Sequence, residues 1–289
     1  MAATTLLKNA AMSVVDYRCC ARPGDAPFAE MHDRFTLAYV RTGSFGACTR
    51  GKLHELVAGS LFIGHPGDEY TCVHEHHAGG DECVSFQLAE DVVDTIDARR
   101  TLWRIGAVPP VRGLVMLGEL ASAAVDGTTS ISLEEIGMLL AAEFASVVQR
   151  GNEENAPLPS VRDRRRAVDA ARWIDANAHR QVTLAMAAKY ANTSEFHFLR
   201  LFRAVLGVTP HQYLVQCRLR LAARLLCDAD GTVTSVAFDA GFGDLSNFIR
   251  TFTQAAGMSP RAFRHRVRAR RRADLVPKPA SDLRLRRSR

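Results

Sequence analysis

The first part of the chain alternates apolar and polar residues in short runs, and Gly and Pro separate these runs. Five runs have the length of β-strands, namely residues 35–40, 52–57, 60–64, 69–74 and 83–88. Short strands separated by tight turns are typical of a small antiparallel barrel or sandwich. We therefore predict a β-barrel over about residues 1–108.

A helical period replaces the alternation after residue 110. Residues 111–126 and 132–150 repeat apolar side chains every three or four positions, which gives each helix one apolar face. In the second helix this face consists of Leu133, Ile136, Leu139, Leu140, Phe144 and Val147. Two roles fit it equally, because such a face serves either to cover the barrel or to form the interface of a homodimer.

The second half of the chain contains an internal repeat with a spacing of 50 residues. The first copy has Ala187, Ala191, Ser194, Phe198, Arg200, Phe202, Gly207, Thr209, Pro210 and Tyr213. The second copy has Ala237, Gly241, Asp244, Phe248, Arg250, Phe252, Gly257, Ser259, Pro260 and Phe263. Each position keeps identical or similar chemistry without a gap, so the unit is a duplication.

Each copy of the repeat has the pattern of two short helices joined by a tight turn. The first helices are predicted at 184–190 and 233–240, and the side-chain oxygen of Ser194 or Asp244 then caps the second helix. Gly207 or Gly257 ends that helix, with a proline shortly afterwards. We predict two helix-turn-helix units, joined by a helix over residues 209–227.

The second helix of each unit has a core face and an outward face. The outward side chains of such a helix reach base edges in the major groove, and nearby arginines bind phosphates. In the first unit the predicted DNA contacts are Ser194, Glu195, Phe196, His197, Leu199, Arg200 and Arg203. In the second unit they are Asp244, Leu245, Ser246, Asn247, Ile249 and Arg250. Among these, Arg200 and Arg250 are the first candidates for base or phosphate contacts.

Charge divides the chain in the same place as the hydrophobic pattern. Residues 161–289 contain 25 Lys and Arg against 10 Asp and Glu, whereas residues 1–160 contain 12 against 21. A basic half joined to an acidic half indicates that only the basic half meets a polyanion such as DNA. The arginine-rich end of the chain, from residue 269, is predicted to be a disordered tail that adds non-specific attraction to phosphates.

Length and composition indicate a globular protein of two domains, since the 289 residues are 47% hydrophobic and 24% charged. A membrane span needs about 18 uninterrupted apolar residues, and the most apolar stretch, residues 113–125, contains Glu119. Seven cysteines, an odd number without a recognisable secretion signal, indicate reduced thiols. We expect a cytoplasmic protein with no membrane partner.

Residues 72–83, CVHEHHAGGDEC, concentrate histidines, cysteines and carboxylates. If residues 69–76 form a strand and residues 77–80 a loop, one face of a hairpin carries Cys72, His74, His76, Asp81 and Cys83. Thiolate and imidazole ligands suit Zn²⁺ or another borderline metal, so all of these except Asp81 are metal candidates.

Other interpretations of this cluster stay open. The five residues also fit an effector or redox site. Three structural alternatives are a polar outer face of a strand, a hairpin with partly buried thiols, and a hydrogen bond between histidine and aspartate. Because no nucleophile with a positioned base accompanies the cluster, we predict no catalysis and no required cofactor.

The basic half resembles a known family of regulators. SEFHFLRLFRAVLGVTPHQY at 194–213, AGFGDLSNFIRTF at 240–252 and GMSPRAFR at 257–264 are similar to the signature of the AraC/XylS family of bacterial transcription regulators. The resemblance covers about residues 165–266. It implies a monomeric DNA-binding domain with two helix-turn-helix motifs, usually acting as an activator, and an N-terminal cupin-like barrel that senses an effector or dimerises. Leu199 departs from the pattern, since many members have a polar residue there.

We therefore predict an α+β multidomain protein with four segments. These are a cupin-like sensor or dimerisation domain at 1–150, a linker at 151–160, an AraC-type DNA-binding domain at 161–268 and the basic tail at 269–289. The expected partners are double-stranded operator DNA, RNA polymerase, an unknown small-molecule effector and a second copy of the chain. Two alternatives to an effector-responsive activator stay open: a cupin-type metalloenzyme with a DNA-binding appendage, and a constitutive regulator whose barrel only dimerises.

Overall fold

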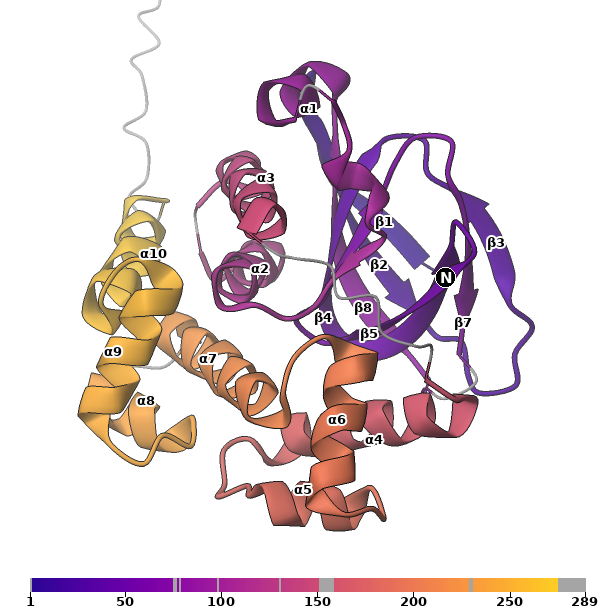
Figure 1. Ribbon diagram of the computed structural model, residues 1–289. Helices are drawn as coiled ribbons and strands as arrows, with labels where there is room; N and C mark the ends of the chain where they lie inside the picture. Colours follow the sequence, from indigo (N-terminus) through magenta and orange to yellow (C-terminus); the bar gives the residue numbers. More distant parts are fainter. Residues whose placement is uncertain are drawn as a thin grey trace, which may run out of the picture.

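The computed structural model describes residues 2–274 apart from 75, 76, 78, 98, 130, 151–158, 229 and 230. An N-terminal domain of β-strands lies beside a C-terminal domain of helices, and two helices of the N-terminal part stand between them (Figure 1). Most of the predicted linker, residues 151–158, and residues 275–289 of the predicted tail lie outside the described residues. Helix α10 (Pro260–Asp274) continues past residue 268, so residues 269–274 are helical where a disordered tail was predicted.

The N-terminal domain is built around one long strand, β4 (Phe35–Thr49), which belongs to two antiparallel sheets. The first half of β4 pairs with β6 (Leu61–Gly64), and β8 (Asp81–Leu88) pairs along most of the strand. The second half pairs with β5 (Lys52–Val57) and β7 (Glu69–Val73). The remaining strands are β1 (Ala2–Lys8), β2 (Met12–Cys19), β3 (Phe28–Met31) and β9 (Ala107–Val108).

The five predicted strands are present, but the predicted closed barrel is not. One sheet runs in the order β1-β2-β8-β4-β6-β9, and the other adds β5, β7 and β3 around the far end of β4. The end strands of the first sheet, β1 and β9, do not pair with each other, so this sheet is open and does not close into a barrel. Strand β2 escaped the sequence analysis because residues 12–16 are buried on both faces, so its sequence lacks the alternation of a half-exposed strand.

Two helices, α2 (Arg112–Val125) and α3 (Leu133–Arg150), cover the first sheet, as the cover interpretation predicts. The side chains of Ile136, Leu140 and Phe144 are fully buried, and the Phe144 ring lies 5.2 Å from that of Trp103. Leu139 is 44% exposed, so only part of the apolar stripe serves as cover. Two short helices, α1 (Glu90–Ile96) and η1 (Leu102–Arg104), complete this layer.

The C-terminal domain contains the duplicated helical units. Its helices are α4 (Val161–Asn177), α5 (Leu184–Tyr190), α6 (Glu195–Leu206), α7 (Pro210–Asp228), α8 (Val233–Asp239), α9 (Leu245–Ala256) and α10. Helix α7 joins the two units and packs along α2, so buried residues of α7 such as Leu219 and Leu226 share one apolar core with Leu114. None of the helices in the described part of the chain combines the length and apolar character that crossing a membrane would need.

Candidate nucleic-acid interface and ligand pocket

Both copies of the repeat fold as helix-turn-helix units with the predicted caps. The Ser194 side chain accepts a hydrogen bond from the His197 amide at 3.4 Å, and that of Asp244 accepts one from the Asn247 amide at 2.7 Å. These bonds satisfy amides at the exposed start of α6 and α9. Each helix ends at a glycine in the left-handed region: φ is 71° at Gly207, which ends α6, and 67° at Gly257, which ends α9.

The outward faces of α6 and α9 are open to solvent. The exposed predicted contacts are Ser194, Glu195, Phe196, His197, Leu199, Arg200, Arg203, Asp244, Ser246, Asn247, Ile249 and Arg250. Leu245 differs from the prediction because it is half-buried and packs against the core of its unit. Two phenylalanines on the inner face of each second helix are fully buried and fix which face turns outward, namely Phe198 and Phe202 in α6 and Phe248 and Phe252 in α9.

Aromatic and amide groups orient the two arginines on these faces. The Arg200 guanidinium lies 5.9 Å from the centre of the Phe196 ring, and Phe196 itself is 71% exposed. Arg250 donates a hydrogen bond to the Asn247 side chain at 3.2 Å. Arg200 therefore lies next to an apolar ring and Arg250 next to a side-chain amide. Arginines contact guanine edges in the major groove, and apolar side chains contact thymine methyl groups.

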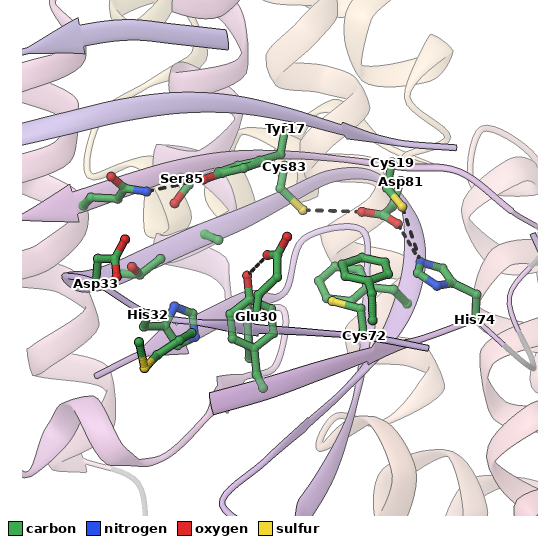
Figure 2. Close-up of a pocket in the computed structure, with 18 residues that line it drawn as sticks. Tyr17, Cys19, Glu30, His32, Asp33, Cys72, His74, Asp81, Cys83 and Ser85 are labelled. Atoms are coloured by element: carbon green, nitrogen blue, oxygen red, sulfur yellow. Dashed lines mark hydrogen bonds and ion pairs between the residues drawn. The ribbon is translucent and has the colours of Figure 1, made fainter. Parts of the chain in front are cut away.

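A second candidate site is a cavity of about 450 Å³ between the two sheets of the N-terminal domain. Figure 2 shows its lining, which combines aromatic rings and thiols with a few polar groups. Burial lowers the pKa of His32 to about 4 and raises the pKa of Cys72 to about 12. The imidazole of His32 and the thiol of Cys72 are therefore neutral at pH 7, and the cavity suits a small organic molecule with an apolar body.

The cluster predicted at residues 72–83 lies in this cavity, but not on one hairpin. Strand β7 pairs with β3 and β4, whereas β8 pairs with β2 and β4, so the two strands belong to facing sheets. Cys72, His74, Asp81 and Cys83 nevertheless line the same cavity from opposite sides. His76 lies outside the described residues.

A cysteine that the sequence analysis did not select completes the cluster. The Nε2 atom of His74 lies 3.4 Å from Oδ2 of Asp81 and 3.7 Å from Sγ of Cys19 (Figure 2). Cys19 and Asp81 are cross-strand partners on β2 and β8. The sequence feature that identifies Cys19 is its position at the end of β2, opposite Asp81, and this feature requires that β2 is first assigned as a strand.

Comparisons with known proteins agree with the geometry of the helical domain. A family model described as a helix-turn-helix domain matches residues 187–266. The MmsAB operon regulatory protein of Pseudomonas aeruginosa is 36% identical over 90 residues, which are 31% of this chain and 29% of that protein. The transcriptional activator RhaS of Salmonella arizonae is 28% identical over 166 residues, or 56% of each chain.

Among solved structures, the DNA-binding domain of AdpA in complex with a target DNA is 33% identical to this chain. That similarity covers 37% of this chain and 96% of the other, with a TM-score of 0.36. The C-terminal domain is an AraC-type DNA-binding domain. The chain spans less than two thirds of the length of the curated relatives named above.

The AraC-type domain is joined to the N-terminal domain by a buried cluster of charges. Glu119 of α2 accepts hydrogen bonds from Tyr39 at 2.9 Å, from Arg220 at 3.3 Å and from Arg224 at 2.6 Å. Arg220 also donates to the carbonyl oxygens of Ala58 and Arg41, at 3.2 and 3.0 Å. We call the group Tyr39, Glu119, Arg220 and Arg224 the interdomain cluster.

A second contact reaches the AraC-type domain from the loop that carries His74. The buried carboxylate of Glu55 on β5 lies 3.2 Å from Nε2 of His77 and, through its other oxygen, 3.2 Å from Nε of Arg164 on α4. The His77 ring also lies 2.9 Å from the Ser44 hydroxyl. One carboxylate therefore connects His77, which lies three residues after the cavity-lining His74, with the first helix of the AraC-type domain.

Proposed function

We propose that this protein is a sequence-specific transcription regulator whose AraC-type domain binds operator DNA through α6 and α9. The observation that carries the proposal is the pair of capped helices in the same phase, each with an exposed N-terminal face on a basic domain. Helix α7 has 19 residues and measures about 28 Å. One turn of DNA is roughly 34 Å, which supports insertion of both units into successive major grooves.

The proposed contacts are those on the outward faces of α6 and α9. Arg200 and Arg250 bind guanine edges or phosphates, while Phe196, Leu199 and Ile249 supply apolar contacts to thymine methyl groups. As an activator, the protein would act with RNA polymerase at the promoter. In vitro transcription from a fragment containing the operator tests this part, since an activator raises transcript yield and a repressor lowers it.

Operator selection followed by titration tests the DNA-binding proposal. Genomic fragments that bind the full chain at physiological salt are enriched, and affinity is then measured for Arg200→Ala and Arg250→Ala. We expect each variant to lose about 1–3 kcal/mol of specific binding, which is roughly 5- to 150-fold in affinity. Arg165→Ala is the control, because Arg165 is an exposed arginine of α4 and belongs to neither of the proposed recognition helices, α6 and α9. Unchanged affinity in both recognition variants would show that the helices are oriented wrongly.

We further propose that residues 1–150 form a cupin-like sensor domain and that its cavity receives the signal. The charged contacts of Glu119 and Glu55 support this role, because each links the N-terminal domain with an arginine of the AraC-type domain. Coupling between two sites is reciprocal, so an effector that changes the operator affinity requires operator binding to change the effector affinity of the N-terminal domain in return. Hydrogen exchange with and without operator DNA checks this, and an N-terminal domain with unchanged exchange rates would refute the coupling.

A further inference from the structure

The three groups around His74 do not form an ordinary hydrogen-bonded set. Both Cys19 Sγ and Asp81 Oδ2 approach the same ring nitrogen, Nε2. A ring nitrogen either donates one proton or accepts one, so it satisfies only one of these partners at a time. The 3.4 Å separation from the carboxylate is also longer than the roughly 2.7–2.9 Å typical of charge-assisted hydrogen bonds from nitrogen to a carboxylate.

The same separations fit a shared metal ion. Around a tetrahedral zinc ion, bond lengths of about 2.0–2.3 Å place a nitrogen roughly 3.6 Å from a sulfur and roughly 3.4 Å from an oxygen. The corresponding distances at His74 are 3.7 Å and 3.4 Å, and all three ligand atoms lie within 4.8 Å of one another. We propose that Cys19, His74 and Asp81 bind one divalent ion of the zinc class.

The three ligands come from well-packed positions. Cys19 ends β2 and Asp81 begins β8, and the two residues are direct partners in the sheet. Asp81 is held against the backbone of Gly43, where any side chain on Gly43 would approach the Asp81 Cα to 2.8 Å. The His74 ring stacks on Phe28 with a centroid separation of 6.2 Å. The ligands are therefore arranged before the ion arrives, which lowers the cost of binding it.

The chemistry of the ligands selects the class of ion. Thiolate and imidazole together favour Zn²⁺, Co²⁺ and similar ions over Mg²⁺ and Ca²⁺, which prefer oxygen. One thiolate and one carboxylate balance the charge of a divalent ion. The cavity offers a fourth ligand position, because the Cys83 thiol also lines it and lies 3.9 Å from Oδ1 of Asp81. A water, the Cys83 thiolate or an effector with a donor atom fits that position.

This site gives a chemical identity to the signal, and in that respect it rests on the proposed function of the cavity as a sensor. The ion lies close to the contact that reaches the AraC-type domain. His74 and His77 are joined by a backbone hydrogen bond of 3.2 Å, and His77 contacts Glu55, which contacts Arg164. Metal binding at His74 thus acts on His77 and, through Glu55, on Arg164 of α4.

Titration of the metal-free full-length protein with Co²⁺ tests the site. We expect one equivalent to bind, with a thiolate-to-cobalt charge-transfer band in the near ultraviolet and intense visible bands typical of tetrahedral coordination. Cys19→Ser lowers the affinity for Co²⁺ by roughly 100-fold or more. It also removes the charge-transfer band or, if Cys83 supplies the fourth ligand, weakens that band. Asp81→Asn lowers the affinity without removing the thiolate band. Cys20→Ser is the matched control, because Cys20 is the exposed neighbour of Cys19 and does not line the cavity.

Two results would overturn the inference: no stoichiometric Co²⁺ in the wild-type protein, or Cys19→Ser with wild-type affinity and an unchanged band. Circular dichroism of each variant verifies that it is folded. Operator affinity, measured on the same samples, separates this inference from the proposed function. A protein that binds its operator but no metal refutes only the metal site, whereas one that binds metal but prefers no DNA sequence refutes only the regulator.

Discussion

The interdomain cluster makes a quantitative prediction about Glu119. Its side chain is 1% exposed, and it interacts with two arginines and a tyrosine hydroxyl. Replacing Glu119 with Leu leaves the buried guanidinium of Arg220 without one of its two carboxylate partners. Removing one member of a buried ion pair usually costs about 3–5 kcal/mol.

The expected loss lies near the lower end of that range. Arg220 keeps its ion pair with Asp175 at 3.2 Å and its bonds to two carbonyl oxygens. Arg224 is 41% exposed at its side chain, so water replaces the lost carboxylate there. We therefore expect Glu119→Leu to lower the free energy of unfolding by about 3 kcal/mol, out of the roughly 5–15 kcal/mol typical of folded proteins.

Equilibrium unfolding in urea measures this loss, with Glu134→Leu as the control because Glu134 is exposed on α3. The double variant Glu119→Leu with Arg220→Met should lose at least about 1 kcal/mol less than the sum of the two single variants, because it buries no unpaired charge. If Glu119→Leu unfolds within about 0.5 kcal/mol of the wild type, or if the two changes add, the cluster does not hold the domains together and the reasoning fails.

Three further predictions follow from individual residues. Because burial lowers the pKa of His32 to about 4, the unfolded chain takes up a proton first as pH falls below about 6.5, and stability is lost towards pH 4. His32→Phe should reduce the difference in unfolding free energy between pH 7 and pH 5 by about 2 kcal/mol, and an unchanged difference would contradict this. Gly118→Ala should cost about 1–3 kcal/mol because the new methyl group would lie 2.2 Å from the Tyr39 ring. Gly243→Ala, which meets no atom within 4 Å, is its control, and equal urea midpoints would refute the clash. Asp244→Ala should lower the free energy of unfolding by about 1 kcal/mol, because α9 loses its N-terminal cap. A variant that unfolds at the same temperature as the wild type would show that the cap contributes nothing.

The sequence by itself determined the helix-turn-helix units of the AraC-type domain. Their caps, C-terminal glycines and buried phenylalanines act within a few residues of one another, so the local pattern of Ser194 to Gly207 already specifies one capped helix and its inner face. The duplication then repeats this local information with a fixed spacing. The exception, Leu245, is half-buried because its neighbours in the core come from elsewhere in the fold.

Only the tertiary structure decided the pairing of residues that are distant along the chain. Cys19 meets His74 and Asp81 because β2 and β8 are neighbours in one sheet while β7 belongs to the facing sheet, and no local pattern contains that register. Glu119 interrupted an apolar stretch in the sequence, and its partners Arg220 and Arg224 lie more than a hundred residues away. A buried charge requires a partner, but only the packing of α2 against α7 selects which one.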